Sequence, residues 1–285
     1  MTTPVILVTG ATSIVGRYLL PLLAAQEYQV IAISRHPHDG GSAGWVCTDI
    51  TTGPIPPEAR DAEILIHLAP LPTLIPLLQG GALSAVRRVI AIGTTSVFTK
   101  ADTRASDERD TIAAQREAER SLAASGEIAG FRWTLFRPTL VYDGTHDKNI
   151  VHIMRFIARF GFFPVVKPAS GLRQPLHAAD LAWACASVLD KPLTEAKSYN
   201  LAGGQVLSYR EMVEQVFHSL GKQPRFVAVH PWIYRAALTI LNMYPRYRYM
   251  KPEMAQRMNM DMVFDIAAAR RDFGFSPKPF RLYSL

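Results

Sequence analysis

A glycine-rich turn near the start of the chain is the first feature that could do chemistry. Residues 5–9 (VILVT) form a short apolar run typical of a buried parallel strand, and the turn GATSIVG at 10–16 follows directly. Gly10 permits a sharp turn, and Gly16 permits close packing of the helix that begins near Val15. A helix N-terminus placed over such a turn binds anions, so the segment predicts a pyrophosphate site. The residues expected to hold the pyrophosphate are Gly10, Thr12, Ser13, Ile14, Val15 and Gly16. An ordinary strand-to-helix turn is the alternative.

The end of the second predicted strand indicates which dinucleotide would bind. NAD sites usually have an acidic residue there, which bonds the ribose hydroxyls. In this chain the strand ends at Ser34, and Arg35 and His36 follow it. A neutral residue and then a guanidinium suit a 2′-phosphate, so NADP is favoured over NAD. The alternative is that Arg35 is a surface charge without a ligand.

Composition limits the other functions. The 285 residues carry a net charge of +7, with 48% hydrophobic and 19% charged residues, as in a globular protein. The positive charge favours anionic ligands, but no basic stripe interleaved with aromatic residues indicates nucleic acid. No apolar run has the length of a membrane span, and Met1-Thr-Thr-Pro does not resemble a secretory leader. Two cysteines form neither a disulfide framework nor a metal cluster, so we expect a cytoplasmic protein without a metal.

The order of predicted elements gives the fold class. The first half alternates strands with helices, which is typical of a parallel sheet covered on both faces. Ligands of such sheets bind beyond the carboxyl ends of the strands. The second half is richer in helices, proline and glycine. The predicted strands are 5–9, 29–34, 64–68, 88–92, 133–137 and 198–201. The predicted helices are 15–26, 73–86, 108–124, 149–160, 179–189 and 208–220.

Several motifs, taken in their order along nearly the whole chain, resemble the extended short-chain dehydrogenase/reductase family of nucleotide-sugar epimerases and dehydratases. These motifs are TGATSIVG at 9–16, CTDI at 47–50, HLA at 67–69, IAIGTTSVF at 90–98, FRPTLVYDG at 136–144, GLRQPLHAADLA at 171–182 and YNLAGG at 199–204. The resemblance implies that Asp49 and Ile50 meet the adenine, that Leu68, Ala69 and Pro138 line the cofactor, and that Thr94 is the active-site hydroxyl. Thr95 and Ser96 are alternatives to Thr94, and Thr95 is also expected to contact the substrate.

The chain departs from this family at the pair that transfers the proton. The family has a tyrosine there and a lysine four residues later, with a glutamate commonly four residues after the lysine. In TIAAQREAERSL these positions are Thr111, Gln115 and Glu119. A threonine hydroxyl ionises far above pH 7, and Gln115 supplies no charge, although it can bond a ribose. The candidate replacements for the proton donor are Asp107, Glu108, Asp110, Tyr142 and His146.

The resemblance also implies a substrate site. Arg173 stands where family epimerases bind the nucleotide diphosphate, and Asn149 resembles an asparagine that contacts the same region. No clear match exists for the second phosphate arginine of the family. The apolar and basic segment at 225–251 replaces it, and is interpreted as a packed helix, a lid, or a surface for a membrane or partner.

The sequence thus predicts a Rossmann-type, doubly wound α/β protein. Residues 1–145 would bind NADP, and 146–285 would form a smaller, helix-rich substrate part with segments that return to the sheet. One hypothesis is oxidoreductase or epimerase chemistry on a small molecule such as a nucleotide sugar, with a relocated proton donor. A second is a catalytically degraded NADP-binding sensor or assembly module. A third is a peripheral membrane or nucleic-acid binder, for which only the positive charge and the segment at 232–251 speak. The helix at 108–124 is where relatives often pair as homodimers.

Overall fold

A computed structural model of the chain describes residues 3–38, 40–41, 43–99, 106–234, 238 and 253–282. The chain divides into two compact units, which we call the sheet unit and the second unit. The sheet unit comprises Met1–Thr139, Ala178–Leu201 and Asp265–Ser276, and the second unit comprises Leu140–His177, Ala202–Phe264 and Pro277–Leu285. The segments Ala178–Leu201 and Asp265–Ser276 therefore return to the sheet unit after the chain has entered the second unit.

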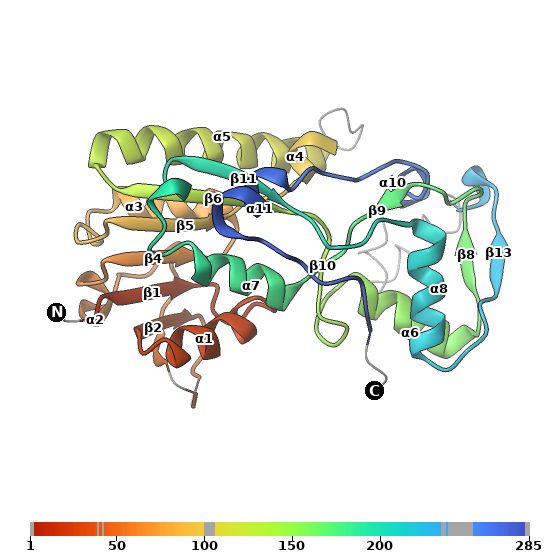
Figure 1. The fold of residues 1–285 in the computed structure, drawn as a ribbon, viewed down its shortest axis with the longest axis horizontal. Helices are drawn as coiled ribbons and strands as arrows, with labels where there is room; N and C mark the ends of the chain where they lie inside the picture. The colour runs from red at the N-terminus through yellow and green to blue at the C-terminus, as the bar shows by residue number, and fades with distance from the viewer. Residues whose placement is uncertain are drawn as a thin grey trace. The chain divides into compact units, whose positions relative to one another are not determined.

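The sheet unit is built on a seven-stranded parallel sheet (Figure 1). The strand order is β11-β6-β5-β4-β1-β2-β3, which reverses direction between β1 and β4. Dinucleotides bind at such a reversal, beyond the carboxyl ends of the strands. The strands are β1 Val5–Thr9, β2 Gln29–Ser34, β3 Gly44–Cys47, β4 Ile64–His67, β5 Arg88–Ile92, β6 Arg132–Pro138 and β11 Lys197–Leu201.

Helices cover both faces of this sheet. Parallel crossovers are right-handed, and β1 to β2 runs in the opposite direction across the sheet from β4 to β5, so α1 and α3 lie on opposite faces. On one face α3 and α5 bury Leu7, Leu65 and Val89 together with their own apolar residues, and α1 packs against α7. The helices are α1 Gly16–Ala25, α2 Pro57–Arg60, α3 Leu74–Gln79, α4 Ser96–Thr99, α5 Ser106–Ala129, α7 Ala178–Ser187 and α11 Ala267–Phe273, with short 3₁₀ turns at Leu71–Thr73 and Pro192–Thr194.

A buried arginine attaches the returning segment to the sheet. Arg88 at the start of β5 is 4% exposed, and its Nη2 donates hydrogen bonds to Thr134 Oγ1, Val188 O and Thr194 Oγ1. Burial lowers the pKa of Arg88 to about 10, which leaves it charged at neutral pH. Thr134 Oγ1 also donates to Thr194 O. These bonds hold the chain after α7 in the position from which β11 joins β6.

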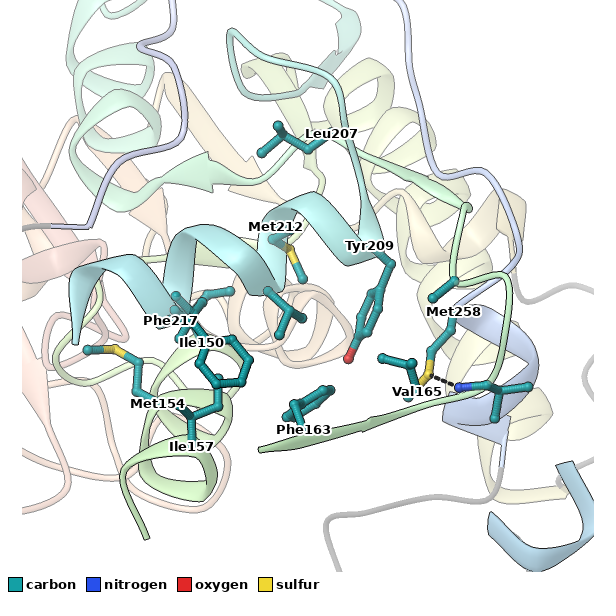
Figure 2. Close-up of a cluster of buried hydrophobic side chains, with 14 of the residues drawn as sticks. Ile150, Met154, Ile157, Phe163, Val165, Leu207, Tyr209, Met212, Phe217 and Met258 are labelled. Atoms are coloured by element: carbon teal, nitrogen blue, oxygen red, sulfur yellow. Dashed lines mark hydrogen bonds between the residues drawn. The ribbon is translucent and has the colours of Figure 1, made fainter. Parts of the chain in front are cut away.

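The second unit has its own apolar core, to which α6 and α8 contribute many of the buried side chains (Figure 2). Three two-stranded sheets belong to the same unit. Ile150, Met154 and Ile157 of α6 pack with Met212 and Phe217 of α8. Ser208 caps α8 reciprocally with Glu211, which fixes where that helix begins. The elements are α6 Ile150–Phe160, α8 Tyr209–Ser219, α10 Glu253–Arg257, β7 Val141–Tyr142, β8 Phe163–Val165, β9 Leu172–Arg173, β10 Leu176–His177, β12 Leu207–Ser208 and β13 Phe226–Ala228.

The fold class predicted from the sequence is confirmed, and most of the predicted elements are present. Strands β1, β2 and β5 have the predicted bounds, while β3 was missed because GWVC is short and only partly buried. The predicted helix at 73–86 is reduced to α3, which ends at Gln79 before Gly80 and Gly81. The predicted helix at 179–189 and strand at 198–201 correspond to α7 and β11, and both belong to the sheet unit.

Candidate functional site

The glycine-rich turn closes tightly against its own neighbours. Gly10 has a φ of +66°, and a Cβ there would lie 2.6 Å from the amide nitrogen of Ala69. A Cβ on Gly16 would lie 2.0 Å from the carbonyl oxygen of Ala11. Both positions therefore require glycine for the shape of the turn itself. The turn and the Leu68–Ala69 segment after β4 approach each other as a result.

Some backbone amides of this turn donate hydrogen bonds within the protein, and others do not. Ser13 N donates to Gly10 O, and Gly16 N donates to Ser13 Oγ at 3.2 Å. The serine side chain thus folds back onto the helix start. Within the described ranges, the amides of Ile14 and Val15 donate to no protein acceptor. Two unpaired amides at the N-terminus of α1 fit a bound pyrophosphate.

A histidine lies directly behind the turn. His67, the last residue of β4, is fully buried, and its Nδ1 lies 2.7 Å from Thr9 Oγ1. Its Nε2 lies 3.3 Å from the carbonyl oxygen of Pro70. Burial lowers the pKa of His67 to about 4, so the ring is neutral at pH 7. The sequence motif HLA marked this place, but the bond to Thr9 was not predicted.

The residues expected to meet the adenosine follow two adjacent strands. Ser34 and Cys47 pair at the ends of β2 and β3, so Arg35 and Asp49 lie close to the same sheet edge. Arg35 is exposed, and its positive charge contributes to lowering the pKa of Asp49, after the larger effect of hydrogen bonds from Thr51. Asp49 Oδ1 accepts from Thr51 N and Oγ1. Ser34 Oγ accepts from His36 N, which orders the turn around Arg35.

Two threonines follow β5 on the other side of the sheet reversal. Thr95 is buried, and both its amide and its hydroxyl donate to the carbonyl oxygen of Pro138. Its hydroxyl therefore serves the sheet edge rather than a substrate. Thr94 is partly exposed, and its Oγ1 accepts from Ser96 N at the start of α4. The hydroxyl hydrogen of Thr94 is left for a ligand.

The two positions to which the family resemblance assigns the proton-transfer pair, Thr111 and Gln115, lie on α5. Thr111 Oγ1 donates to the carbonyl oxygen of Asp107 at 2.7 Å, one turn earlier in the helix. Its hydroxyl hydrogen is therefore bound to the backbone. Gln115 Oε1 is buried and has no hydrogen-bond partner in the described part of the chain. Such an unpaired acceptor is costly unless a ligand donates to it.

One turn further along α5, an ion pair anchors the helix to the sheet. The guanidinium of Arg137 on β6 donates to both carboxylate oxygens of Glu119, at 2.7 to 3.0 Å. The two side chains are 19% and 11% exposed. A Cβ on Gly93 would lie 2.9 Å from Glu119 Oε1, so glycine there makes room for the pair. The pair also leaves no net charge beside Gln115.

Two of the residues expected at the substrate, Arg173 and Asn149, lie in the second unit. Arg173 is 6% exposed and donates to the carbonyl oxygens of Leu172, Met260 and Arg257. Its guanidinium also lies over the ring of Tyr209, at 5.6 Å from the centroid. Burial lowers the pKa of Arg173. The arginine is thus held by backbone oxygens, which differs from the expected role of binding a phosphate.

The start of α6 is already occupied by a carboxylate. Asp147 is 5% exposed, and its Oδ1 accepts from Ile150 N at 2.6 Å and from Asn149 N at 2.9 Å. Its Oδ2 accepts from Gly144 N at 3.0 Å. Asn149 itself is exposed and caps no amide. Sequence reasoning missed Asp147, although an aspartate just before a helical pattern is a recognised capping signal.

Tyr142, proposed from the sequence as a replacement proton donor, is 1% exposed. Its hydroxyl accepts from Arg281 N at 3.1 Å and lies 3.4 Å from Arg281 O. Its ring contacts His177 and Phe280 edge to face. The hydroxyl therefore holds the C-terminal segment of the second unit, and we assign it no proton transfer.

Two further observations concern ligands and membranes. In the described ranges, no three His, Cys, Asp or Glu side chains gather so that they could hold a metal ion. None of the helices there combines the length and the apolar character that a membrane span requires. Of the apolar and basic segment at 225–251, residues 235–237 and 239–251 lie outside the described residues.

Comparisons with known proteins agree with this geometry. Residues 6–69, from β1 to just beyond β4, match the model of the NAD dependent epimerase/dehydratase family. A solved structure with a TM-score of 0.74 is UDP-glucuronic acid 4-epimerase from Bacillus cereus, in complex with UDP-glucuronic acid and NAD. It is 14% identical, and the match covers 96% of this chain and 94% of that one. The chain therefore shares its fold with this epimerase.

Two curated relatives have a different name. Both are called NADH dehydrogenase [ubiquinone] 1 alpha subcomplex subunit 9, mitochondrial. The Arabidopsis thaliana protein is 28% identical over 95 residues, which are 33% of this chain and 23% of the relative. The Dictyostelium discoideum protein is 25% identical over 230 residues, covering 73% of this chain and 62% of the relative. The chain thus spans less than two thirds of either relative.

Proposed function

We propose that this chain is a nicotinamide dinucleotide-binding module that holds its cofactor without the tyrosine-based proton transfer of epimerases. The observation that carries the proposal is the state of Thr111 and Gln115. The Thr111 hydroxyl donates to Asp107 O at 2.7 Å, and the unpaired acceptor of Gln115 replaces a lysine. The amides of Ile14 and Val15 are available as donors, whereas Thr111 and Gln115 stand where the family has its tyrosine and lysine.

The residues present fit such a cofactor. The amides of Ile14 and Val15 would bind the pyrophosphate, and Asp49 Oδ2 is left to accept from the adenine amine. The amide oxygen of Gln115 would accept from a hydroxyl of the nicotinamide ribose. Thr94 would donate its hydroxyl hydrogen toward the same end. The bound group would supply a nicotinamide ring able to carry a hydride, but neither Thr111 nor Gln115 supplies the acid that would accompany this transfer.

We further propose NADP as the preferred form. The support is Ser34 followed by the exposed guanidinium of Arg35, in place of a carboxylate that would repel a 2′-phosphate. The Bacillus cereus epimerase was solved with NAD, so the preference rests on Arg35 alone.

The names of the relatives suggest where such a module would act. We propose that the chain is a bound, non-catalytic subunit or assembly factor of an NADH dehydrogenase-like complex. A tagged chain would then comigrate with NADH dehydrogenase activity on native separation. A homodimer through α5 stays a prediction. A cytoplasmic location also stays a prediction, since the relatives are named as mitochondrial.

Epimerase or dehydratase chemistry on a nucleotide sugar is the second candidate. The match to the UDP-glucuronic acid 4-epimerase over 96% of the chain favours it. It would need a relocated proton donor and a free phosphate ligand, whereas Arg173 and the start of α6 already have internal partners.

Calorimetric titration and turnover together test these proposals. We expect heat of binding with NADPH and weaker binding with NADH, and no conversion of UDP-glucose or UDP-glucuronic acid to another sugar in the presence of NADP⁺ or NAD⁺. An Arg35→Ala variant should lose the preference for NADPH. Absence of binding by every nicotinamide coenzyme would overturn the module. Turnover of a UDP-sugar would instead support the second candidate.

A further inference from the structure

The sheet topology indicates where the two halves of a bound dinucleotide would lie. The pyrophosphate belongs at the N-terminus of α1, after β1, at the reversal of the strand order. Ser34 and Arg35 follow β2 and draw the adenosine to that side. The nicotinamide half must therefore extend the other way, over the ends of β4, β5 and β6. Thr94 follows β5, and α5 packs against β6.

Gln115 is the unused polar group of α5 on that side. Its Oε1 is buried without a partner, whereas Glu119, one turn later, is fully engaged by Arg137. A ribose hydroxyl donating to this oxygen would remove the cost of the unpaired acceptor. The amide of Gln115 can accept this hydrogen bond without bringing a charge to the site. A lysine at the same position would bring a positive charge.

Among the described residues, the charged groups considered near Gln115 include no free buried cation. Arg137 is neutralised by Glu119. Arg116 is exposed to solvent, and its Nη2 donates to Val97 O at 2.6 Å. Glu108, 7% exposed and two turns earlier on α5, adds no positive charge. Thr94, Thr111 and Gln115 are neutral.

We propose that this site, in which the described residues place no free buried cation, makes the chain bind the oxidised, positively charged nicotinamide at least as tightly as the reduced, neutral ring. The inference rests on the proposed cofactor binding. A lysine at position 115 would repel the oxidised ring, and its replacement by glutamine removes that repulsion. The fraction of the protein with bound cofactor would then depend on the total concentration of NADP⁺ and NADPH, and not on the concentration of NADPH alone.

The test compares the dissociation constants of NADP⁺ and NADPH, measured by calorimetry under anaerobic conditions on the full chain. The wild-type ratio of Kd for NADPH to Kd for NADP⁺ should be one or more. Gln115→Lys should lower this ratio by about tenfold, because a unit charge a few ångströms from the ring acts on only one form. Gln115→Met should weaken both forms equally and leave the ratio unchanged.

A matched control uses the neighbouring exposed residue Ala114. Ala114→Lys adds the same charge to the solvent side of α5, where it is screened, so the ratio should stay at the wild-type value. The inference is overturned if wild-type protein binds NADPH tenfold more tightly than NADP⁺, or if Gln115→Lys does not change the ratio. Failure to bind either form would overturn the proposed function itself. Melting curves of each variant identify any loss of folding.

Discussion

Thr9 Oγ1 lies 2.7 Å from His67 Nδ1 and joins the ends of β1 and β4 immediately before the glycine-rich turn. His67 Nε2 lies 3.3 Å from both the carbonyl oxygen of Pro70 and the hydroxyl oxygen of Thr73. The Thr73 hydroxyl donates its own hydrogen to Pro70 O, so both neighbours of Nε2 can accept, and Nε2 carries the ring hydrogen. Nδ1 must then accept the hydroxyl hydrogen of Thr9. This arrangement requires a neutral ring, in agreement with the pKa of about 4 that burial imposes on His67.

The first prediction follows from this pKa. An unfolded histidine titrates near pH 6.5, so between pH 6.5 and 4 the unfolded chain binds a proton that folded His67 does not. The free energy of unfolding should therefore fall by about 3 kcal/mol as the pH is lowered through this window. His67→Asn, which keeps an acceptor for Thr9, should flatten the profile. Urea unfolding at pH 7, 6 and 5 measures it.

The exposed His218 on α8 provides the control. His218→Asn should retain the wild-type dependence of stability on pH. If His67→Asn also retained it, the acid sensitivity would belong to other groups, and the neutral Thr9–His67 bond would be wrong.

The second prediction concerns the steric role of Gly16. A Cβ at this position would lie 2.0 Å from Ala11 O, a backbone atom that cannot move away without opening the turn. Gly16→Ala should therefore cost about 3 kcal/mol or more of stability and abolish coenzyme binding. Gly80→Ala is the control, because Gly80 is also right-handed and its nearest atom would be 3.5 Å away. It should change stability by less than about 1 kcal/mol. Equal effects of the two would contradict the steric argument.

The sequence predicted the sheet better than the site because the two are encoded differently. Buried parallel strands are continuous apolar runs, so VILVT, QVIAIS and RVIAI were recognisable. The turn at Gly10 was recognisable because its backbone needs a left-handed residue. The short strand β3, which is only partly buried, lacks such a run and was missed.

The second unit shows what local patterns could not reveal. Arg173 was expected at a phosphate, but its guanidinium bonds to carbonyls some 85 residues later in the chain, at Arg257 and Met260. No local pattern in the sequence predicts a contact between residues that lie so far apart in the chain. The bond of Thr111 to Asp107 is local, yet it depends on which rotamer the threonine adopts, because its hydroxyl can point outward or back along the helix.

The third prediction compares two ion pairs of α5. Glu119 and Arg137 are largely buried, and their bidentate contact ties the helix to β6. Glu119→Ala should leave the guanidinium without its carboxylate and cost about 3 kcal/mol. Glu117 pairs with Arg120 on the exposed side, where the side chains are 65% and 75% exposed. Glu117→Ala should cost less than about 1 kcal/mol. Urea unfolding of both variants in parallel checks the difference. Similar losses of stability would show that the buried Glu119–Arg137 pair contributes no more than the exposed Glu117–Arg120 pair.

The last prediction concerns Asp147 at the start of α6. Its carboxylate accepts hydrogen bonds from five backbone amides, and three of them, Gly144 N, Asn149 N and Ile150 N, lie at 2.6 to 3.0 Å. In Asp147→Asn the new amide group would face donors that need an acceptor, and the favourable charge at the helix N-terminus would be lost. We expect a loss of about 1–2 kcal/mol, measured by urea unfolding. Lys148→Gln, at the exposed neighbouring residue, should have no such effect.

The same carboxylate bears on the choice between the two candidate functions. A diphosphate placed at this helix start would meet Asp147 instead of free amides, and the two negative charges would repel each other. Wild-type protein should therefore bind UDP weakly by calorimetry, and Asp147→Asn should bind it more tightly provided that the variant remains folded. Tight UDP binding by the wild-type chain, unchanged in Asp147→Asn, would place the diphosphate elsewhere and restore nucleotide-sugar chemistry as the leading function.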